Sequence, residues 1–274
     1  MANIHPTSIV EGDVKLADDV EIGPCCVVRG PVTIGAGSRV LGHSHLTGKL
    51  VIGKGNTIYP FCCLGFAGQD ASYPNDMFEP GIVIGNGNTL REYSSVHRAT
   101  RDLATTIGND NFFMTSSHVA HDCIVGNNCT LVTQASLGGH VWVDDGVIIG
   151  GGAAVHQFVR IGRGVLVSGL GGVSQDIPPF FTVTGINIVA SPNLVGMRRS
   201  GMDRDEITKR KDIFKLLYRD GGTKAQMLQR LRSAGDDISS EYADFIEATR
   251  KGVCLGTPDE RRSERRNKGR LIDA

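Results

Sequence analysis

The chain has 274 residues, long enough for two domains, and its 29 Lys and Arg residues balance its 29 Asp and Glu residues. This balance argues against a net electrostatic attraction to nucleic acid or to an anionic membrane. Glycine accounts for 36 residues without a Gly-X-Y period, and aromatic residues make up only 6%. This combination is typical of a repetitive architecture with tight turns.

The cysteines and the N-terminal residues indicate in which cellular compartment the protein is found. Seven cysteines, an odd number without a CxxC pair, argue against a disulfide framework or a zinc knuckle. The start, MANIHPTSIV, lacks the basic residues and apolar run of a signal peptide, and the longest apolar run is too short to span a bilayer. We therefore expect a soluble, cytoplasmic protein with reduced thiols, no nucleic-acid partner and no stable membrane insertion.

Apolar residues recur at every sixth position from Ile4 to Val173. They form three runs of 11, 3 and 12 positions that begin at Ile4, Ile84 and Ile107. A fixed short period of this kind marks a solenoid whose turns stack on one another. The hexapeptides resemble those of the hexapeptide-repeat acyltransferase superfamily. The resemblance implies a mainly β fold, a left-handed parallel β-helix in which three hexapeptides make one triangular coil of 18 residues.

The six-residue register is interrupted twice. At neither break is the spacing between repeat positions a multiple of six residues. Each break therefore predicts an external loop, the first at about residues 66–81 and the second at residues 98–106. After about Pro179 the period is lost. The β-helix is therefore expected to cover residues 1–185.

A small C-terminal α-helical domain is expected over residues 186–255. Ser191-Pro192 predicts a helix start, and Asp203 with Glu206 predicts the capping box of a longer helix. That helix carries an apolar stripe at helical spacing, at Ile207, Phe214, Leu217 and Tyr218. Residues 256–274 are dense in charge and are expected to form a disordered tail.

The histidines are expected to line up along one side of the β-helix. His121, His140 and His156 fall in hexapeptides whose first residues are 18 positions apart, and His118 ends a preceding hexapeptide. His97 joins the column if the second break is one hexapeptide with five inserted residues. A solenoid wall that faces water needs no histidine for stability, so the column favours a functional site over scattered solvated side chains.

Two chemistries suit such a column. A zinc site needs ligands that converge within about 2.1 Å of one point, and the spacing of His118 and His121 does not resemble the wider pair of the γ-type carbonic anhydrases. No metal is therefore expected. A general base is favoured, because a neutral imidazole can take a proton from an alcohol or amine that attacks an acyl thioester. Backbone N–H groups in Leu137-Gly-Gly-His140 can bind the resulting oxyanion.

Seven motifs resemble the UDP-N-acetylglucosamine O-acyltransferase family, which begins lipid A synthesis. They are HPTSIVEGDV, SSVHR, SSHVAHDCIVGNNC, LGGHVWVDD, IIGGGAAVHQFVRIG, SQDIPPF and GMRRSG. The resemblance implies transfer of an (R)-3-hydroxyacyl chain from acyl carrier protein to the 3-position of UDP-N-acetylglucosamine. It implies no cofactor and a homotrimer with its site between neighbouring subunits.

The resemblance also assigns roles to residues of this chain. His121 is the implied general base, Asp122 the residue that orients it, and the Gly139 N–H the oxyanion donor. The implied substrate-binding residues are His118, His140, His156 and Gln157 for the sugar and its diphosphate, Gln69 and Asp70 over the acceptor, Asn193, Arg198 and Arg199 at the nucleotide, and Gly169 at the end of the acyl groove.

Two positions depart from the family pattern. Ser72 stands where a lysine is usual, and Val195 where a glutamate is usual. Both bear on the acceptor, so transfer to the amine of a 3-amino sugar nucleotide remains an alternative. The basic residues Lys209–Lys211, Lys215 and Arg219 are a candidate surface for the acidic carrier protein, although a solvated helix face is the simpler interpretation.

Three further functions are compatible with a hexapeptide solenoid. A sibling N-acyltransferase of the same pathway carries an extra domain before its hexapeptides, whereas here they begin at Ile4. A metal-dependent γ-type carbonic anhydrase would need the metal site that the histidine spacing does not favour. A non-catalytic solenoid scaffold would need neither the histidine column nor a loop with Gln69 and Asp70.

Overall fold

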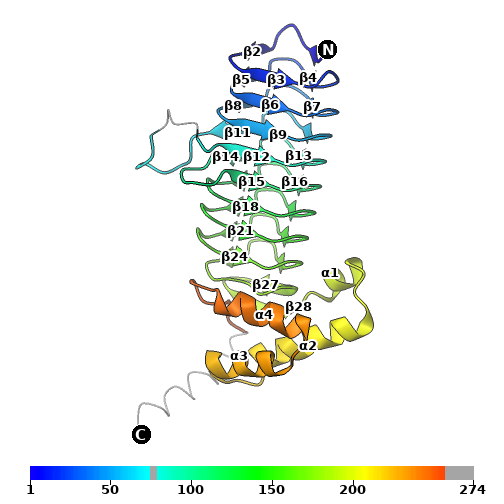
Figure 1. The fold of residues 1–274 in the computed structure, drawn as a ribbon, viewed down its shortest axis with the longest axis vertical. Helices are drawn as coiled ribbons and strands as arrows, with labels where there is room; N and C mark the ends of the chain where they lie inside the picture. Colours follow the sequence, from blue (N-terminus) through cyan, green and yellow to red (C-terminus); the bar gives the residue numbers. More distant parts are fainter. Residues whose placement is uncertain (75–78, 257–274) are drawn as a thin grey trace.

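The protein is a prism of stacked coils with a group of helices at one end. The computed structural model describes residues 1–74 and 79–256. Figure 1 shows the N-terminus at one end of the prism and the helices packed against the last coils at the other. The predicted fold class, a mainly β solenoid of parallel strands followed by C-terminal helices, is confirmed.

The strands form three sheets that run along the prism. Sheet A contains β1 (Asn3–Ile4), β4 (Glu21–Ile22), β7 (Arg39–Val40), β10 (Thr57–Ile58), β13 (Thr89–Leu90), β16 (Phe112–Phe113), β19 (Thr130–Leu131), β22 (Ile148–Ile149), β25 (Leu166–Val167), β27 (Phe181–Thr184) and β28 (Ile188–Pro192). Sheet B contains β2 (Ile9–Glu11), β5 (Val27–Arg29), β8 (His45–Thr47), β11 (Cys63–Phe66), β14 (Ser95–His97), β17 (His118–Val119), β20 (Ser136–Leu137), β23 (Ala154–Val155) and β26 (Gly172–Val173). Sheet C contains β3 (Val14–Leu16), β6 (Val32–Ile34), β9 (Leu50–Ile52), β12 (Ile82–Ile84), β15 (Thr105–Ile107), β18 (Ile124–Val125), β21 (Trp142–Val143) and β24 (Arg160–Ile161).

Each coil passes through the sheets in the order A, B, C. The prism therefore has three kinds of corner, which we name the A–B, B–C and C–A corners after the sheets they join. Strands of successive coils pair in register, as where Val119 lies beside Leu137 and Leu137 beside Val155. This pairing confirms the predicted coil of 18 residues in the uninterrupted part of the chain.

The core is the stack of hexapeptide apolar residues. Leu131, Leu137 and Val143 have no exposed surface, and the same holds within a few per cent for the repeat positions from Ile22 onward. Ile4 is the most exposed of the earlier repeat positions, with 40% of its surface exposed, while Val10 and Leu16 are partly buried. It lies in the first coil, which has a neighbour on one side only, so a solenoid end leaves its apolar residue uncovered.

Both predicted loops leave the prism at the B–C corner. The first joins β11, which ends at Phe66, to β12, which begins at Ile82. The second joins β14, which ends at His97, to β15, which begins at Thr105. Because both loops connect sheet B to sheet C, they project from the same edge of the prism, as Figure 1 shows for the larger one.

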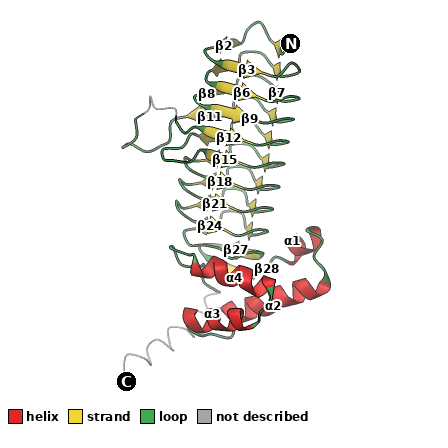
Figure 2. Ribbon diagram, viewed as in Figure 1, coloured by secondary structure: helices red, strands yellow, loops and turns green. Residues whose placement is uncertain are grey.

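The helical region contains α1 (Leu194–Arg199), α2 (Arg204–Tyr218), α3 (Lys224–Ser233) and α4 (Asp237–Glu247), drawn in red in Figure 2. The capping box predicted for α2 is confirmed. The helix start predicted at Ser191-Pro192 is wrong. These residues end β28, which pairs antiparallel with β27 and extends sheet A past residue 185. Asn193 is the cap of α1 instead, because its side chain accepts the N–H of Gly196.

A buried ion-pair network joins the helices to the last coils. Arg210 of α2 is only 1% exposed and contacts Glu241 of α4 at 2.9 Å. Glu241 also binds Arg163, which lies at a C–A corner. In addition, the Tyr242 hydroxyl donates to the carbonyl of Pro179 at 2.8 Å. Charged and aromatic contacts thus attach the helical region to the β-helix.

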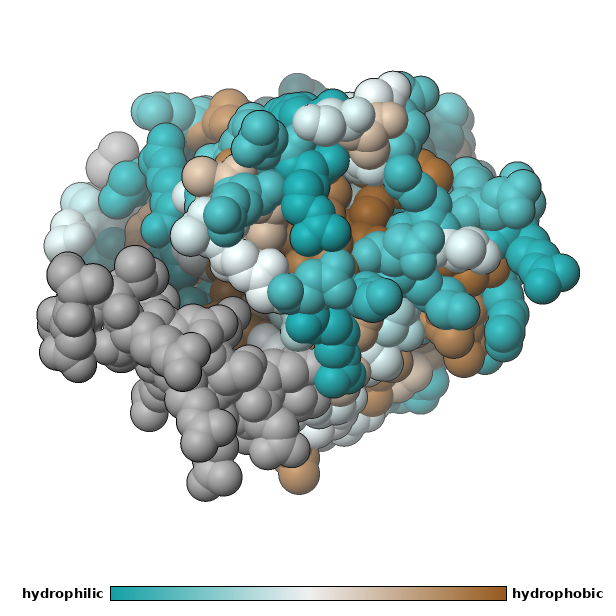
Figure 3. Space-filling view, turned by 90° about the horizontal axis from the view of Figure 1, so that it is seen from below, coloured by the Kyte–Doolittle hydropathy of each residue, from teal (hydrophilic) through white to brown (hydrophobic). Residues whose placement is uncertain are grey.

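These contacts correct the candidate carrier surface. Arg210 points into the protein, and Lys209 is paired with Asp236 at 2.7 Å, so Lys209–Lys211 is not a continuous basic face. Figure 3 shows that the helical end of the molecule is mainly hydrophilic, with apolar residues visible between the polar ones. None of the described helices is long and apolar enough to cross a membrane. The tail predicted over residues 256–274 lies almost entirely outside the described residues.

Candidate active site

His121, Asp122 and His140 meet at the B–C corner of two successive coils. His121 and Asp122 follow β17, and His140 follows β20 one coil later. The Nδ1 atom of His121 lies 2.6 Å from Oδ2 of Asp122, and Nε2 of His140 lies 3.6 Å from the same oxygen. The rings of His121 and His140 meet edge to face, with centroids 5.2 Å apart. His121 is only 9% exposed.

The second loop supplies hydrogen bonds to the Asp122 carboxylate. The Thr100 hydroxyl donates at 2.7 Å, and the backbone N–H groups of Thr100 and Arg101 each donate at 3.0 Å. Burial alone would raise the pKa of Asp122, but the hydrogen bonds from His121 and Thr100 outweigh it and lower the pKa. Asp122 is therefore an ionised acceptor, so His121 Nδ1 is the donor, and in the neutral form of the imidazole Nε2 carries the lone pair.

Two glycines leave room for the His121 imidazole. A Cβ at Gly139 would lie 2.7 Å from Cε1 and 2.8 Å from Nε2 of that ring. A Cβ at Gly68, in the first loop, would lie 2.9 Å from Cβ of His121 and 2.8 Å from the Thr100 methyl group. Such separations are too short for any side chain, so both backbones can approach the imidazole only as glycine.

The first loop also places Asp70 near His121. The Asp70 carboxylate accepts the backbone N–H of Ser72 at 2.9 Å and its hydroxyl at 2.6 Å. These two bonds, with smaller contributions from His121 and Arg101, lower the pKa of Asp70. Ser72 thus fixes the orientation of Asp70 within the loop, while the neighbouring Gln69 is exposed.

Neutral histidines flank His121 along sheet B. The Nδ1 atom of His118 lies 2.8 Å from the Ser95 hydroxyl, and its ring contacts His97 edge to face at 5.0 Å. Burial, followed by the charge of His121, lowers the pKa of His118. Burial and the neighbouring His118, His121 and Arg98 lower the pKa of His97 to about 4. His97 Nδ1 is buried without a hydrogen-bond partner among the described residues.

The column continues into the next coil. The His140 ring stacks on Phe158 with a centroid distance of 4.5 Å, and burial lowers the pKa of His140. His156 and Gln157 are exposed at the same B–C corner, directly after β23. The backbone of Gln157 lies against Gly138, where a Cβ would be 2.9 Å from the Gln157 nitrogen.

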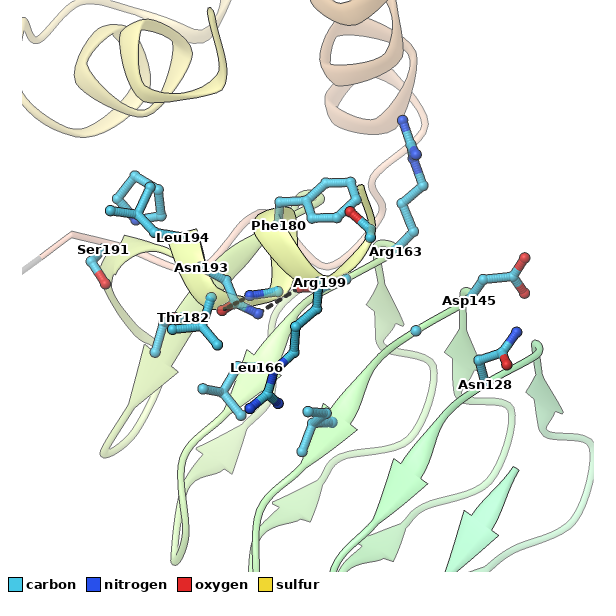
Figure 4. Close-up of a pocket in the computed structure, with 17 residues that line it drawn as sticks. Asn128, Asp145, Arg163, Leu166, Phe180, Thr182, Ser191, Asn193, Leu194 and Arg199 are labelled. Atoms are coloured by element: carbon cyan, nitrogen blue, oxygen red, sulfur yellow. Dashed lines mark hydrogen bonds between the residues drawn. The ribbon is translucent and has the colours of Figure 1, made fainter. Parts of the chain in front are cut away.

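The other predicted site residues lie at different corners. Asn193 and Arg199 line a cavity of about 920 Å³ between α1 and the C–A corner. Figure 4 shows Arg199 extending over sheet A beside Leu166, and Asn193 held by hydrogen bonds. Arg198 is exposed outside that lining, and Gly169 is exposed at an A–B corner, between β25 and β26. One chain therefore does not bring all the predicted residues together.

His121, Asp122 and His140 are close enough to raise the question of a metal site, because their ligand atoms lie within 4.8 Å of one another. Two ligands of one tetrahedral zinc lie roughly 3.3 Å apart, given bonds of about 2.0 Å. The 2.6 Å between His121 and Asp122 is shorter. That separation fits a shared proton, and Asp122 already accepts three bonds from the second loop.

Comparison with known proteins shows the family to which the chain belongs. A family model described as UDP N-acetylglucosamine O-acyltransferase, domain 2, matches residues 176–254, and one described as bacterial transferase hexapeptide (six repeats) matches residues 104–139. A curated relative from Thermodesulfovibrio yellowstonii is 38% identical over 259 residues, covering 93% of this chain and all of the relative. It is named acyl-[acyl-carrier-protein]--UDP-N-acetylglucosamine O-acyltransferase. The chain belongs to the UDP-N-acetylglucosamine O-acyltransferase family.

Solved structures of this family superpose on nearly the whole chain. The acyltransferase of Francisella novicida is 32% identical, with a TM-score of 0.90 over 94% of this chain and 95% of its own. That of Campylobacter jejuni is 33% identical, with a TM-score of 0.87 over 93% and 100%. The family predicted from the motifs is therefore confirmed.

Several residues of the site were not singled out from the sequence. Thr100 and Arg101 hold Asp122 although they lie in a loop predicted only by a break in the repeat. Gly68 and Phe158 contact the histidines, and their only signal was their proximity to the recognised motifs. His97 was placed in the column without a role.

Proposed function

We propose that the protein transfers an (R)-3-hydroxyacyl chain from acyl carrier protein to the 3-position of UDP-N-acetylglucosamine, the first step of lipid A biosynthesis, in the cytoplasm. The name of the Thermodesulfovibrio relative supports both substrates. The observation that carries the proposal is the His121–Asp122 pair, whose free Nε2 atom faces the backbone of Gly139.

His121 is the general base of the proposed reaction. Its Nε2 atom takes the proton of the acceptor 3-hydroxyl as the oxygen attacks the thioester carbonyl. The ionised Asp122 stabilises the imidazolium that forms and keeps Nδ1 protonated. When the tetrahedral intermediate collapses, the C–S bond breaks and the imidazolium returns the proton to the leaving thiolate.

Gly139 supplies the oxyanion donor. Its backbone N–H forms no hydrogen bond with any residue in the described ranges 1–74 and 79–256, whereas the N–H groups of Gly138 and His140 are bonded to Val155 and His121. A buried, unbonded N–H next to the base can bind the negative charge that develops on the carbonyl oxygen.

The proposed enzyme is a homotrimer with composite sites. His121 at the B–C corner and the cavity of Asn193 and Arg199 at the C–A corner lie on different edges of one chain. A neighbouring copy that places its C–A corner against the B–C corner brings the base and the nucleotide-binding residues together. Gly169 follows β25 of sheet A, whose Leu166 also lines the cavity of Asn193 and Arg199, so a neighbour that presents this face of sheet A would place Gly169 at the edge of the same composite site.

Complementation tests the composite site. His121→Ala and Arg199→Ala homotrimers should each be nearly inactive, because each lacks one half of every site. Mixed trimers, formed by co-expression, should regain activity, since some sites then receive Arg199 from one copy and His121 from another. If mixing restores nothing although both variants fold, His121 and Arg199 act within one chain or not at all.

The acceptor group is tested with two substrates. Purified protein should acylate UDP-N-acetylglucosamine faster than its 3-amino analogue. A preference for the amine would arise at Ser72 or Val195. Ser72 holds Asp70, and Val195 is 56% exposed beside the nucleotide cavity. A higher kcat/KM for the amine would assign the 3-amino sugar nucleotide instead, and no transfer to either would overturn the proposed function.

A further inference from the structure

We propose that Arg98 is a positioning residue for the acceptor, because its guanidinium fixes the root of the first loop beside His121. The inference rests on the proposed function in one respect, namely that Gln69 and Asp70 of this loop meet the acceptor. Arg98 follows β14, at the start of the second loop, and is only 3% exposed. Its Nη1 atom donates a hydrogen bond to the carbonyl of Gly65 at 2.9 Å.

Gly65 forms a β-bulge at the point where the first loop leaves sheet B. The register of β11 against β14 shifts between Leu64 and Phe66, so Gly65 is an extra residue without a partner in β14. Its φ of +94° lies in the left-handed region, and a Cβ there would collide with the carbonyl oxygen of Thr47. Only glycine fits this bend. A β-bulge redirects the strand that contains it, so the bond from Arg98 holds the point that sets the direction of the loop.

Backbone hydrogen bonds join the two loops at their ends. The Arg98 N–H donates to the carbonyl of Phe66 at 3.0 Å, where the first loop begins. The carbonyl of Gly81, where this loop ends, accepts the N–H groups of Ala99 at 3.2 Å and Thr105 at 3.1 Å. Arg98 thus contributes a backbone bond and a side-chain bond to the junction. The side-chain bond is the one that a substitution can remove.

The junction lies close to the proposed base. Gly68, three residues after the bulge, packs so tightly that a Cβ would lie 2.9 Å from Cβ of His121 and 2.8 Å from the Thr100 methyl group. A change of direction at the bulge would therefore move Gly68, and Asp70 after it, relative to the imidazole. The stacked coils are held together by their own apolar residues. The bond from Arg98 therefore mainly determines where the first loop lies.

Arg98→Met tests the inference, because methionine keeps an unbranched apolar stem and removes the donor. Arg98→Lys keeps the positive charge and a donor for the same carbonyl. Arg39→Met is the matched control, since Arg39 pairs with Glu21 at 2.8 Å on sheet A, whereas the loops leave at the B–C corner. Backbone amide exchange, steady-state kinetics with both substrates and thermal unfolding are measured for the full-length wild type and the three variants.

Arg98→Met should speed amide exchange in residues 66–74 and 98–106 by about tenfold, because it removes a hydrogen bond from a charged donor. The KM for the sugar nucleotide should rise by a similar factor, since binding must then order the loop. The decrease in kcat should be smaller. The KM for the acyl donor and the exchange in the surrounding coils should hardly change. Arg98→Lys should recover most of the wild-type behaviour, and Arg39→Met should match the wild type.

Unchanged exchange in both loops of Arg98→Met would overturn the inference. Faster exchange in all coils, together with a lower unfolding temperature, would also overturn it, because Arg98 would then stabilise the whole β-helix. The same holds for a decrease in kcat with an unchanged KM for the sugar nucleotide, since acceptor binding would then not depend on the loop. If the wild type transfers no acyl group, the proposed function fails, while the exchange measurements still decide whether Arg98 fixes the loop.

Discussion

The Thr100 hydroxyl donates a 2.7 Å hydrogen bond to Oδ2 of Asp122, the oxygen that also accepts from His121 Nδ1. A loop residue therefore positions the carboxylate that positions the proposed base. Hydrogen bonds to charged groups contribute about 1.5–3 kcal/mol, so this bond is large enough to affect the reaction.

Thr100→Val should lower kcat by roughly one to two orders of magnitude, the equivalent of that bond energy, with little change in the KM of either substrate. Thr100→Ser should restore most of the activity, because it restores the hydroxyl. The acidic limb of the kcat profile should also move to higher pH in the valine variant, since the hydrogen bond from Thr100 helps to lower the pKa of Asp122. Equal kcat and pH profiles in the two variants would reduce Thr100 to a packing role.

His121→Ala should lower kcat by a factor of about 10² to 10⁴, the usual contribution of a general base, while its thermal unfolding stays close to that of the wild type. His140→Ala and His156→Ala should mainly raise the KM for the sugar nucleotide. Near-normal turnover of His121→Ala would exclude it as the base.

Gly139→Ala should lose activity because its Cβ would lie 2.7 Å from the His121 ring and displace it. A loss of about 10² to 10³ in kcat is expected if the oxyanion donor moves as well. Gly172→Ala is the matched control, since its Cβ would find no atom closer than 3.4 Å. The measurement is the steady-state kcat of both variants. A fully active Gly139→Ala variant would contradict the proposed oxyanion site.

Protonation of His97 should destabilise the protein in mildly acidic solution. Its pKa is lowered from 6.5 to about 4 in the folded protein, so the unfolded chain takes up the proton first. The stabilisation is present in full above pH 6.5 and is lost as the pH falls toward 4. Urea unfolding of the wild type and of His97→Asn at pH 7 and pH 4.5 measures this, and the variant should show the smaller pH dependence. If the free energy of unfolding changes equally with pH in both proteins, the pKa of His97 is the same in the folded and the unfolded state.

Gly169→Met should shift the preference toward shorter acyl donors. The glycine is exposed, and a Cβ there would find no atom closer than 3.4 Å, so a long side chain can project into the path of an acyl chain. Each methylene that no longer fits would forfeit about 0.8 kcal/mol. The test is kcat/KM over a series of hydroxyacyl donors, and an unchanged ranking would show that the chain does not end at Gly169.

The sequence predicted the β-helix well because its apolar period directly reports the stacking of coils. The same 18-residue arithmetic placed His121, His140 and His156 at one corner. It did not reveal Thr100, because a hydrogen bond from a loop of irregular length leaves no periodic trace. The sequence also did not show that Arg210 is buried. A run of basic residues on a helix has the same sequence pattern whether its side chains face water or pair with a carboxylate such as Glu241.

The helix start failed for a related reason. Ser191-Pro192 has the local composition of a helix N-terminus, but β27 offers these residues an antiparallel partner. Pairing with a strand ten residues earlier is a tertiary contact, and local propensity cannot anticipate it. The division of the predicted site among three corners was likewise invisible, because motif order in the chain does not give the direction in which each corner faces.

Both loops leave the prism where sheet B turns into sheet C, and the coils on either side of them still pair in register, as where Ile52 lies beside Ile84 and Ile84 beside Ile107. Inserted residues at this edge therefore change what surrounds His121 and Asp122 without altering the stack beneath. This makes the edge a natural place for exchange between homologues. If the first loop is replaced by that of a relative with a different acceptor, the chimera should acquire the acceptor selectivity of the relative. The stability of the β-helix should hardly change.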